Sequence, residues 1–459
     1  MKWLKQFYWP LFTLLLLFPS SGSAKTFNAE TFTLENGVEV IVIPNNRAPV
    51  VIHMVWYKVG AAEEPPTKSG MAHYFEHLMF KGTDTLAPGE FSRIVKDLGG
   101  NDNAFTGQDY TAYYQSIAVE HLEKMMAMEA DRMVNLKVLE EDFISEKNVV
   151  TEERRQRTDN DPKALFSEQM RDTLFTNHPY GTPVIGWMNE IESYDWKDVK
   201  EFYDTWYAPN NAVIIISGDV TVEDVRPLAK KTYGLLETKA LPARKRGEVP
   251  PAIAKTIMRL YDDTIKQESF QSIRIAPSSH QNNQESLALQ VLNEILSGGP
   301  TTRLYKKLVV DNKRAVSVNF SYQADALDYG SIFVSAIPAQ NISLEQINDD
   351  IQNEFNNVIE NGVTEQEVKD AIQRLQDSAV FARDSLSGPA RIIGYSLLTG
   401  SSLDDIENWP KDIGTVNANQ VQDVAKKYLS ATMPYIKPPV EGYLYPKPSA
   451  VKDESEGAE

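Results

Sequence analysis

The chain has 459 residues, which at about 150 residues per domain is enough for two or three domains. Hydrophobic residues make up 42% and charged residues 24%, and this ordinary balance excludes a collagen-like, coiled-coil or disordered chain. The 64 acidic residues outnumber the 46 Lys and Arg, giving a net charge of -18. Nucleic acid is excluded as a partner, because phosphate binding depends on Lys and Arg. The absence of cysteine excludes disulfides, thiolate metal sites and a cysteine nucleophile.

Residues 1–24 have the pattern of a secretory signal peptide. Two lysines precede an apolar run from Phe7 to Phe18, and small residues follow up to Ala24. The run is shorter than the roughly 20 residues that a membrane-spanning helix needs, so we expect cleavage and no membrane anchor. An uncleaved anchor is the alternative. Export of a chain without cysteine fits the bacterial periplasm, where we expect the protein to work.

Apolar periodicity predicts strands and helices in alternation, without a strict βαβ rhythm. The expected strands lie at 31–34, 38–43, 50–59, 110–119, 212–217, 269–276, 315–322 and 330–337. The expected helices lie at 70–81, 88–98, 121–135, 139–157, 284–297 and 364–382. Residues 237–252 have no apolar period and separate two similar patterns. This organisation predicts the α+β class, with two similar halves.

The segment 71–82 reads Met-Ala-His-Tyr-Phe-Glu-His-Leu-Met-Phe-Lys-Gly. On a helix, His73, Glu76 and His77 leave one face within about 100° of arc. Two imidazoles four residues apart can bind one metal ion, with the carboxylate beside its open position, as zinc hydrolases require. A pair of surface histidines on an amphipathic helix is the alternative interpretation.

The helix expected at 139–157 offers a third metal ligand. At about 100° per residue, Glu153 lies roughly 20° from Glu146 on the apolar face, whereas Glu152 lies about 120° away. A carboxylate on a buried face is costly unless it is paired or binds a metal. We therefore interpret Glu153 as the third ligand, Glu146 as a partner that orients a histidine, and Glu152 as a solvated side chain.

The pattern His73-x-x-Glu76-His77, followed by Glu153, resembles the inverted zinc motif of the pitrilysin/insulinase peptidases. The segment 98–114 looks like the family's connection between its two metal-binding helices, and weaker similarity covers most of the mature chain. The resemblance implies one Zn²⁺ per chain on His73, His77 and Glu153, with Glu76 as the general base.

The short two-domain form is similar to mitochondrial processing peptidase β subunits and their bacterial relatives. The resemblance implies a mainly antiparallel sheet flanked by helices in each half. It also implies a peptide substrate bound as an added strand near Asn103, Ala104 and Phe105, a mode that tolerates varied sequences.

The chain departs from the family at one point. Active members usually carry, in the second half, an Arg and a Tyr seven residues apart that hold the substrate carbonyl. Aligned on Arg303-Leu304-Tyr305, those positions hold Val309 and Val316. Valine donates no hydrogen bond to an oxyanion. Either this chain is weak alone, or a homologous partner subunit supplies the pair.

Five segments follow from these observations. They are a signal peptide at 1–24, a zinc-binding peptidase domain at 25–236, a linker at 237–252, a second homologous domain without a metal site at 253–448, and an acidic tail at 449–459. The expected function is that of a zinc endopeptidase subunit acting on peptides or unfolded segments. A non-catalytic scaffold subunit of the same fold is the alternative.

Overall fold

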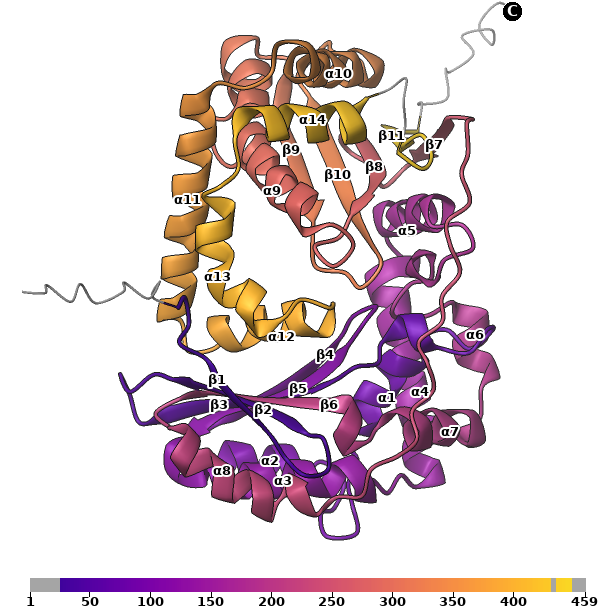
Figure 1. Ribbon diagram of the computed structural model, residues 1–459. Coiled ribbons are helices and arrows are strands. Elements are labelled where there is room, and N and C mark those ends of the chain that lie inside the picture. Colours follow the sequence, from indigo (N-terminus) through magenta and orange to yellow (C-terminus); the bar gives the residue numbers. More distant parts are fainter. Residues whose placement is uncertain (1–24, 431–434, 448–459) are drawn as a thin grey trace, which may run out of the picture.

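The computed structural model describes residues 25–430 and 435–447 and contains two β-sheets with helices packed around them (Figure 1). The predicted signal peptide and acidic tail lie outside the described residues. Both sheets are mainly antiparallel, which confirms the predicted α+β class. Within the described ranges, no helix combines the length and the apolar character needed to cross a membrane.

The first sheet has six strands in the order β1-β2-β6-β3-β5-β4. Only β2 and β6 are parallel neighbours. The strands are β1 (Glu30–Thr33), β2 (Glu39–Pro44), β3 (Val50–Tyr57), β4 (Asn101–Thr106), β5 (Thr111–Ala118) and β6 (Ala212–Gly218). The helices of this half are α1 (Met71–Leu78), α2 (Glu90–Asp97), α3 (Leu122–Asn135), α4 (Glu140–Arg154), α5 (Pro162–Leu174), α6 (Met188–Ser193), α7 (Trp196–Trp206) and α8 (Val222–Lys231).

The second sheet has five strands in the order β7-β11-β8-β10-β9, with β7 and β11 parallel. The strands are β7 (Thr256–Asp262), β8 (Ser269–Pro277), β9 (Ala315–Gln323), β10 (Tyr329–Pro338) and β11 (Val440–Pro446). The helices are α9 (Asn283–Ser297), α10 (Leu344–Asn361), α11 (Glu365–Asp384), α12 (Gly388–Leu398), α13 (Leu403–Ile413) and α14 (Ala418–Leu429).

Each half contributes one helix that covers the sheet of the other half. One face of the first sheet packs on helices of its own half, and the other face buries Ile41 and Trp56 against Ile393 of α12. Conversely, α5 lays Phe166 and Met170 on a face of the second sheet. In Figure 1, α12 lies above β4 and β5, and α5 lies beside the second sheet. Each sheet is therefore covered on one face by a helix from the other half.

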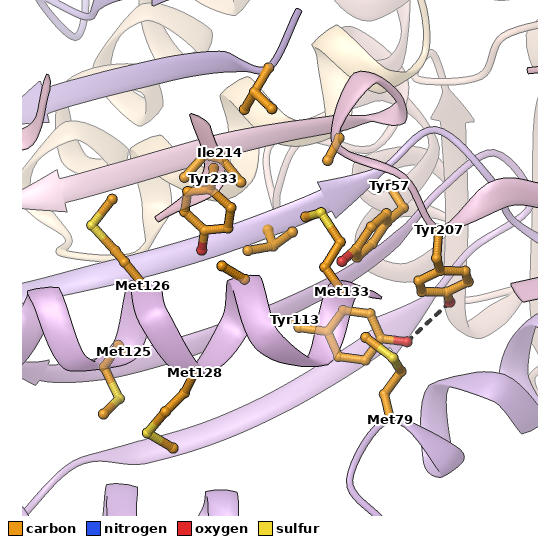
Figure 2. Packing of buried hydrophobic residues seen from close by; sticks show 14 of the residues in the cluster. Tyr57, Met79, Tyr113, Met125, Met126, Met128, Met133, Tyr207, Ile214 and Tyr233 are labelled. Carbon is orange, nitrogen blue, oxygen red and sulfur yellow. Dashed lines mark hydrogen bonds between the residues drawn. The ribbon is translucent and has the colours of Figure 1, made fainter. Parts of the chain in front are cut away.

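The core beneath α1 is rich in methionine and tyrosine. Met125, Met126 and Met128 project from α3, and the Tyr113 and Tyr207 hydroxyls lie 3.1 Å apart (Figure 2). Phe75 of α1 packs on the Tyr207 ring, with 4.5 Å between the ring centroids. Adaptable methionines fill the space between α3 and the sheet, and the aromatic rings form the floor on which α1 rests.

The segment 237–252 has no regular secondary structure, yet buried ion pairs anchor it to both halves. The Arg246 guanidinium contacts the carboxylate of Glu63, and it lies 2.6 Å from Asp109 and 2.9 Å from Asp328. Asp328 precedes β10, whereas Glu63 and Asp109 belong to the N-terminal half. A predicted linker thus carries the charge that joins the halves.

Replacement of Arg246 by alanine tests this junction. Arg246→Ala removes one of the two cations beside the buried Glu63 and Asp109 carboxylates, since Arg244 stays 2.8 Å from Glu63 and 3.9 Å from Asp109. We expect the free energy of unfolding to fall by about 3 kcal/mol. Urea denaturation measures the change. Arg93, whose side chain is 61% exposed beside Glu90 and Asp97, is the matched control, and Arg93→Ala should cost less than about 1 kcal/mol. Equal losses in the two variants would contradict the junction.

Candidate active site

Helix α1 is held at its N-terminus by backbone geometry and by a carboxylate. Gly70 caps the helix with φ 85°, and a Cβ there would lie 2.4 Å from the Ile185 carbonyl oxygen. The Glu64 carboxylate accepts hydrogen bonds from the N–H groups of Gly70 and Ala72, at 2.9 and 2.7 Å. Burial raises the pKa of Glu64, and the hydrogen bonds from Ala72 and Gly70 partly oppose that rise. These contacts fix where the turn that carries His73 begins.

Helix α4 lies against α1 and brings its acidic side chains toward the same point. The Tyr74 hydroxyl donates to the Phe143 carbonyl, and the two rings pack edge to face at 5.5 Å. Glu146 is buried, and its Oε1 lies 2.9 Å from His77 Nδ1. Its second oxygen lies 2.5 Å from Lys81 Nζ. Glu146 therefore orients the His77 ring and leaves Nε2 directed away from it.

Three potential ligand atoms converge between α1 and α4. His73, His77 and Glu153 each offer one atom, and these atoms lie within 4.8 Å of one another. Glu153 Oε2 is 3.4 Å from His77 Nε2 and 3.7 Å from His73 Nε2. The other Glu153 oxygen is 2.7 Å from Arg157 Nη1. Glu152, by contrast, has a side chain that is 54% exposed and points to solvent.

The two histidines differ in their electrostatic surroundings. Burial, with a smaller effect from His77, lowers the pKa of His73 to about 4, so this ring is neutral at pH 7. Burial also acts to lower the pKa of His77, but the hydrogen bonds with Glu146 and Glu153 outweigh it and raise this pKa to about 9. The hydrogen bond with His77 lowers the pKa of Glu153. A cation at this site would therefore displace a proton from His77.

Glu76 lies beside this cluster, on the face of α1 that meets β4. Its Oε2 accepts a 2.6 Å hydrogen bond from the Thr106 hydroxyl at the end of that strand. Burial raises the pKa of the Glu76 carboxyl, and the Thr106 bond partly opposes the rise. A groove of about 530 Å³ runs past Glu76 and His77 to Asn103. A carboxylate with a raised pKa in a groove suits proton transfer near neutral pH.

Strand β4 is the last strand of the first sheet, and β5 is its neighbour there. Asn103, Ala104 and Phe105 therefore lie on a strand whose other edge is available for pairing. Thr106 bonds α1, and Ser92 of α2 bonds Asp102, so the even-numbered side chains face those helices. The Phe105 ring faces the other way and packs on Trp56, with 5.1 Å between the ring centroids.

The two valines aligned with the family's Arg and Tyr lie in the C-terminal half. Val309 belongs to the π-helical turn Tyr305–Asp311 and packs against the core of the second sheet. Val316 is 57% exposed near the start of β9. Arg303 is bound to Glu367 of α11, with contacts of 2.6 and 2.9 Å, and serves packing. Neither valine offers a hydrogen-bond donor.

The profile of the family described as "Insulinase (Peptidase family M16)" matches residues 40–187, and that described as "Peptidase M16 inactive domain" matches residues 194–375. The chain is 30% identical to the zinc protease PqqE of Helicobacter pylori over 416 residues, covering 89% of this chain and 93% of PqqE. The chain belongs to peptidase family M16. This membership confirms the resemblance to the pitrilysin/insulinase peptidases.

Solved structures of M16-like proteins share the fold. A crystal structure of a protease from Helicobacter pylori superposes with a TM-score of 0.83 at 28% identity, covering 91% of this chain and 99% of that one. The periplasmic protease PqqL from Escherichia coli gives a TM-score of 0.76 at 19% identity. In that comparison 91% of the M16 chain described here corresponds to 47% of PqqL.

Two residues that shape the site were missed by sequence reasoning. Thr106 contacts Glu76, and Glu64 caps α1, but neither lies within the His73–His77 motif. The sequence could have indicated Thr106 in one way. Asp102, Ala104 and Thr106 are two residues apart, so in a strand their side chains lie on one face of the sheet. The polar composition of β4 conceals that strand.

Proposed function

We propose that this M16 chain is the metal-bearing subunit of a zinc endopeptidase. The observation that carries the proposal is the convergence of His73, His77 and Glu153, with Glu76 beside them. Zinc bonds to nitrogen and carboxylate oxygen are about 2.0–2.2 Å long, so tetrahedral neighbours stand roughly 3.4 Å apart. The distances of 3.4 and 3.7 Å from Glu153 to the two imidazoles fit that spacing. Two nitrogens and one oxygen are also the donor set of catalytic zinc.

Each residue of the site then has a stated task. Zn²⁺ held there would supply Lewis-acid chemistry, polarising a peptide carbonyl and acidifying water. Glu76 takes up the proton released when water attacks the peptide and returns it to the leaving amine. Glu146 keeps His77 in one orientation, and Thr106 keeps one oxygen of Glu76 engaged so that the carboxylate does not rotate freely.

The peptide itself is proposed to add to the free edge of β4. Backbone groups of Asn103, Ala104 and Phe105 would pair with it, which supplies affinity without demanding a particular sequence. The groove between Glu76 and Asn103 connects this edge with the proposed metal ligand His77. Peptides and unfolded segments, which can adopt an extended conformation, are the substrates that fit.

Glu76→Gln tests the catalytic assignment. The amide cannot accept a proton, so we expect turnover of a quenched fluorescent peptide to fall at least about a hundredfold. The assay uses the complex purified through a tag on this chain. Zinc content by elemental analysis and the melting temperature should stay unchanged. Retention of a tenth of the parent turnover would rule out Glu76 as the base.

The adjacent glutamates of α4 provide a matched test of the metal site. Glu153→Gln replaces a proposed ligand, and we expect zinc affinity to fall at least about tenfold, since two imidazoles alone hold zinc poorly. Glu152→Gln removes the same charge from the exposed face and should leave zinc affinity unchanged. Competition with a chromophoric chelator measures both. The reverse order of effects would refute the assignment.

The two valines suggest that a second subunit completes the site. Charge on the carbonyl oxygen must be stabilised in the transition state, and Val309 and Val316 offer no donor. The chain corresponds to about half of the PqqL polypeptide, so that protein has room for a second unit of similar size. We propose a homologous partner that carries the Arg and Tyr. A scaffold role without hydrolysis is the second candidate, which the same two valines favour.

Reconstitution separates the candidates. The purified chain alone should bind zinc and hydrolyse peptides slowly, and addition of the homologous subunit should raise turnover at least about tenfold, given what one lost oxyanion donor costs. Turnover by the single chain equal to that of the mixture would exclude the partner hypothesis. Zinc binding with no hydrolysis in either sample would favour the scaffold role.

The proposed compartment is the periplasm. Three observations support it: the signal-like pattern of residues 1–24, the absence of cysteine, and the fold shared with a protease described as periplasmic.

A further inference from the structure

Arg391 on α12 contacts aromatic rings where other arginines of the chain contact carboxylates. Its guanidinium lies 5.1 Å from the centroid of the Phe105 ring and 4.7 Å from that of Tyr114. Within the described part of the chain it makes no ion pair and no side-chain hydrogen bond. By contrast, the buried Arg154 and the partly buried Arg303 both pair with carboxylates. The Arg391 guanidinium thus lies over two aromatic rings, and among the described residues its N–H groups have no side-chain acceptor.

This cation stands beside the strand edge on which the substrate is proposed to lie. Tyr114 of β5 is the register partner of Asn103 on β4, so the two side chains share a face of the sheet. Phe105 is on that face too, two residues along the strand. The face is the one covered by α12, opposite to the face that meets α1 and Glu76. Arg391 therefore lies over Phe105 and Tyr114 on the α12 side.

A peptide added to β4 continues the pleat of the sheet. Its side chains point alternately toward α1, which carries His73 and His77, and toward α12, which carries Arg391. A guanidinium stacked on aromatic rings keeps its edge free, and that edge matches a carboxylate with two parallel hydrogen bonds. A side chain of the peptide that points toward α12 thus meets a fixed cation that lacks an anion.

We infer that Arg391 makes this M16 protein prefer peptides with an acidic side chain at one position that faces α12. The inference rests on the proposed peptidase function and on pairing with β4, and it adds the class of substrate. Arg391 contributes from the C-terminal half, so the selection of the peptide joins both halves in one site. Hydrolysis of the bond remains the task of the residues on α1 and α4.

The test begins with the unaltered protein, purified as the complex that it forms. A cleaved peptide is mapped by mass spectrometry, and each position within four residues of the scissile bond is changed in turn to Glu, Gln or Lys. We expect one position at which Glu exceeds Gln at least about tenfold in kcat/KM, through KM, as for hydrogen bonds to charged groups. The absence of such a position would overturn the inference.

Variants of Arg391 then assign the preference. Arg391→Gln should abolish the advantage of the Glu peptide over the Gln peptide in KM, and Arg391→Lys should restore part of that advantage. Arg391→Glu should reverse the preference toward the Lys peptide, a gain that damage to the fold does not produce. A Glu preference that survives in Arg391→Gln would overturn the inference and leave Arg391 as a contact that holds α12 on the sheet.

Arg226 is the matched control. It lies on α8, 4.2 Å from the Phe32 ring of β1, at the opposite edge of the same sheet, and it likewise has no ion pair among the described residues. Arg226→Gln should leave all peptide preferences unchanged. The outcome with Glu76→Gln separates the two proposals. If that variant is inactive and no Glu preference exists, only the role of Arg391 fails, whereas an active Glu76→Gln removes the peptidase assignment itself.

Discussion

The eight residues of α1 depend on their surroundings for their helical shape, because so short a helix is unstable alone in water. The shape is imposed by the aromatic floor under Phe75, by the Glu64 carboxylate at the N-terminus and by the bond from Tyr74 to α4. These contacts also decide where His73 and His77 stand relative to Glu153. The geometry of the site is therefore a property of the whole N-terminal half, and the segment from His73 to His77 supplies only the side chains.

Basic side chains lie beside acidic side chains at the candidate site. The chain is strongly acidic overall, yet the two glutamates that α4 brings to the site each lie beside a cation: Lys81 beside Glu146 and Arg157 beside Glu153. Without these cations, neighbouring carboxylates would repel one another and take up protons, and a protonated carboxylate is a poor ligand. Lys81 and Arg157 thus help to keep Glu146 and Glu153 ionised.

Helical periodicity was enough to place the helices that carry His73, His77 and Glu153. The face shared by Glu146 and Glu153 followed from the spacing of Phe143 and Val150, because both apolar side chains pack inward. Some strands were missed by the same reasoning: β4 is polar and has no apolar alternation, and β11 lies in a proline-rich segment. The roles of Thr106 and Arg246 depend on contacts between distant parts of the chain, which periodicity does not encode.

Because α5 and α12 each cover the sheet of the other half, neither sheet is fully covered until both halves have been made. When a nascent chain has been made only as far as β6, the face of the first sheet with Ile41 and Trp56 still lacks its cover, since α12 comes much later. That apolar surface stays open to water and to other chains until the C-terminal half has folded back. Synthesis therefore passes through a stage vulnerable to aggregation, and a polypeptide cut at the junction would remain at that stage.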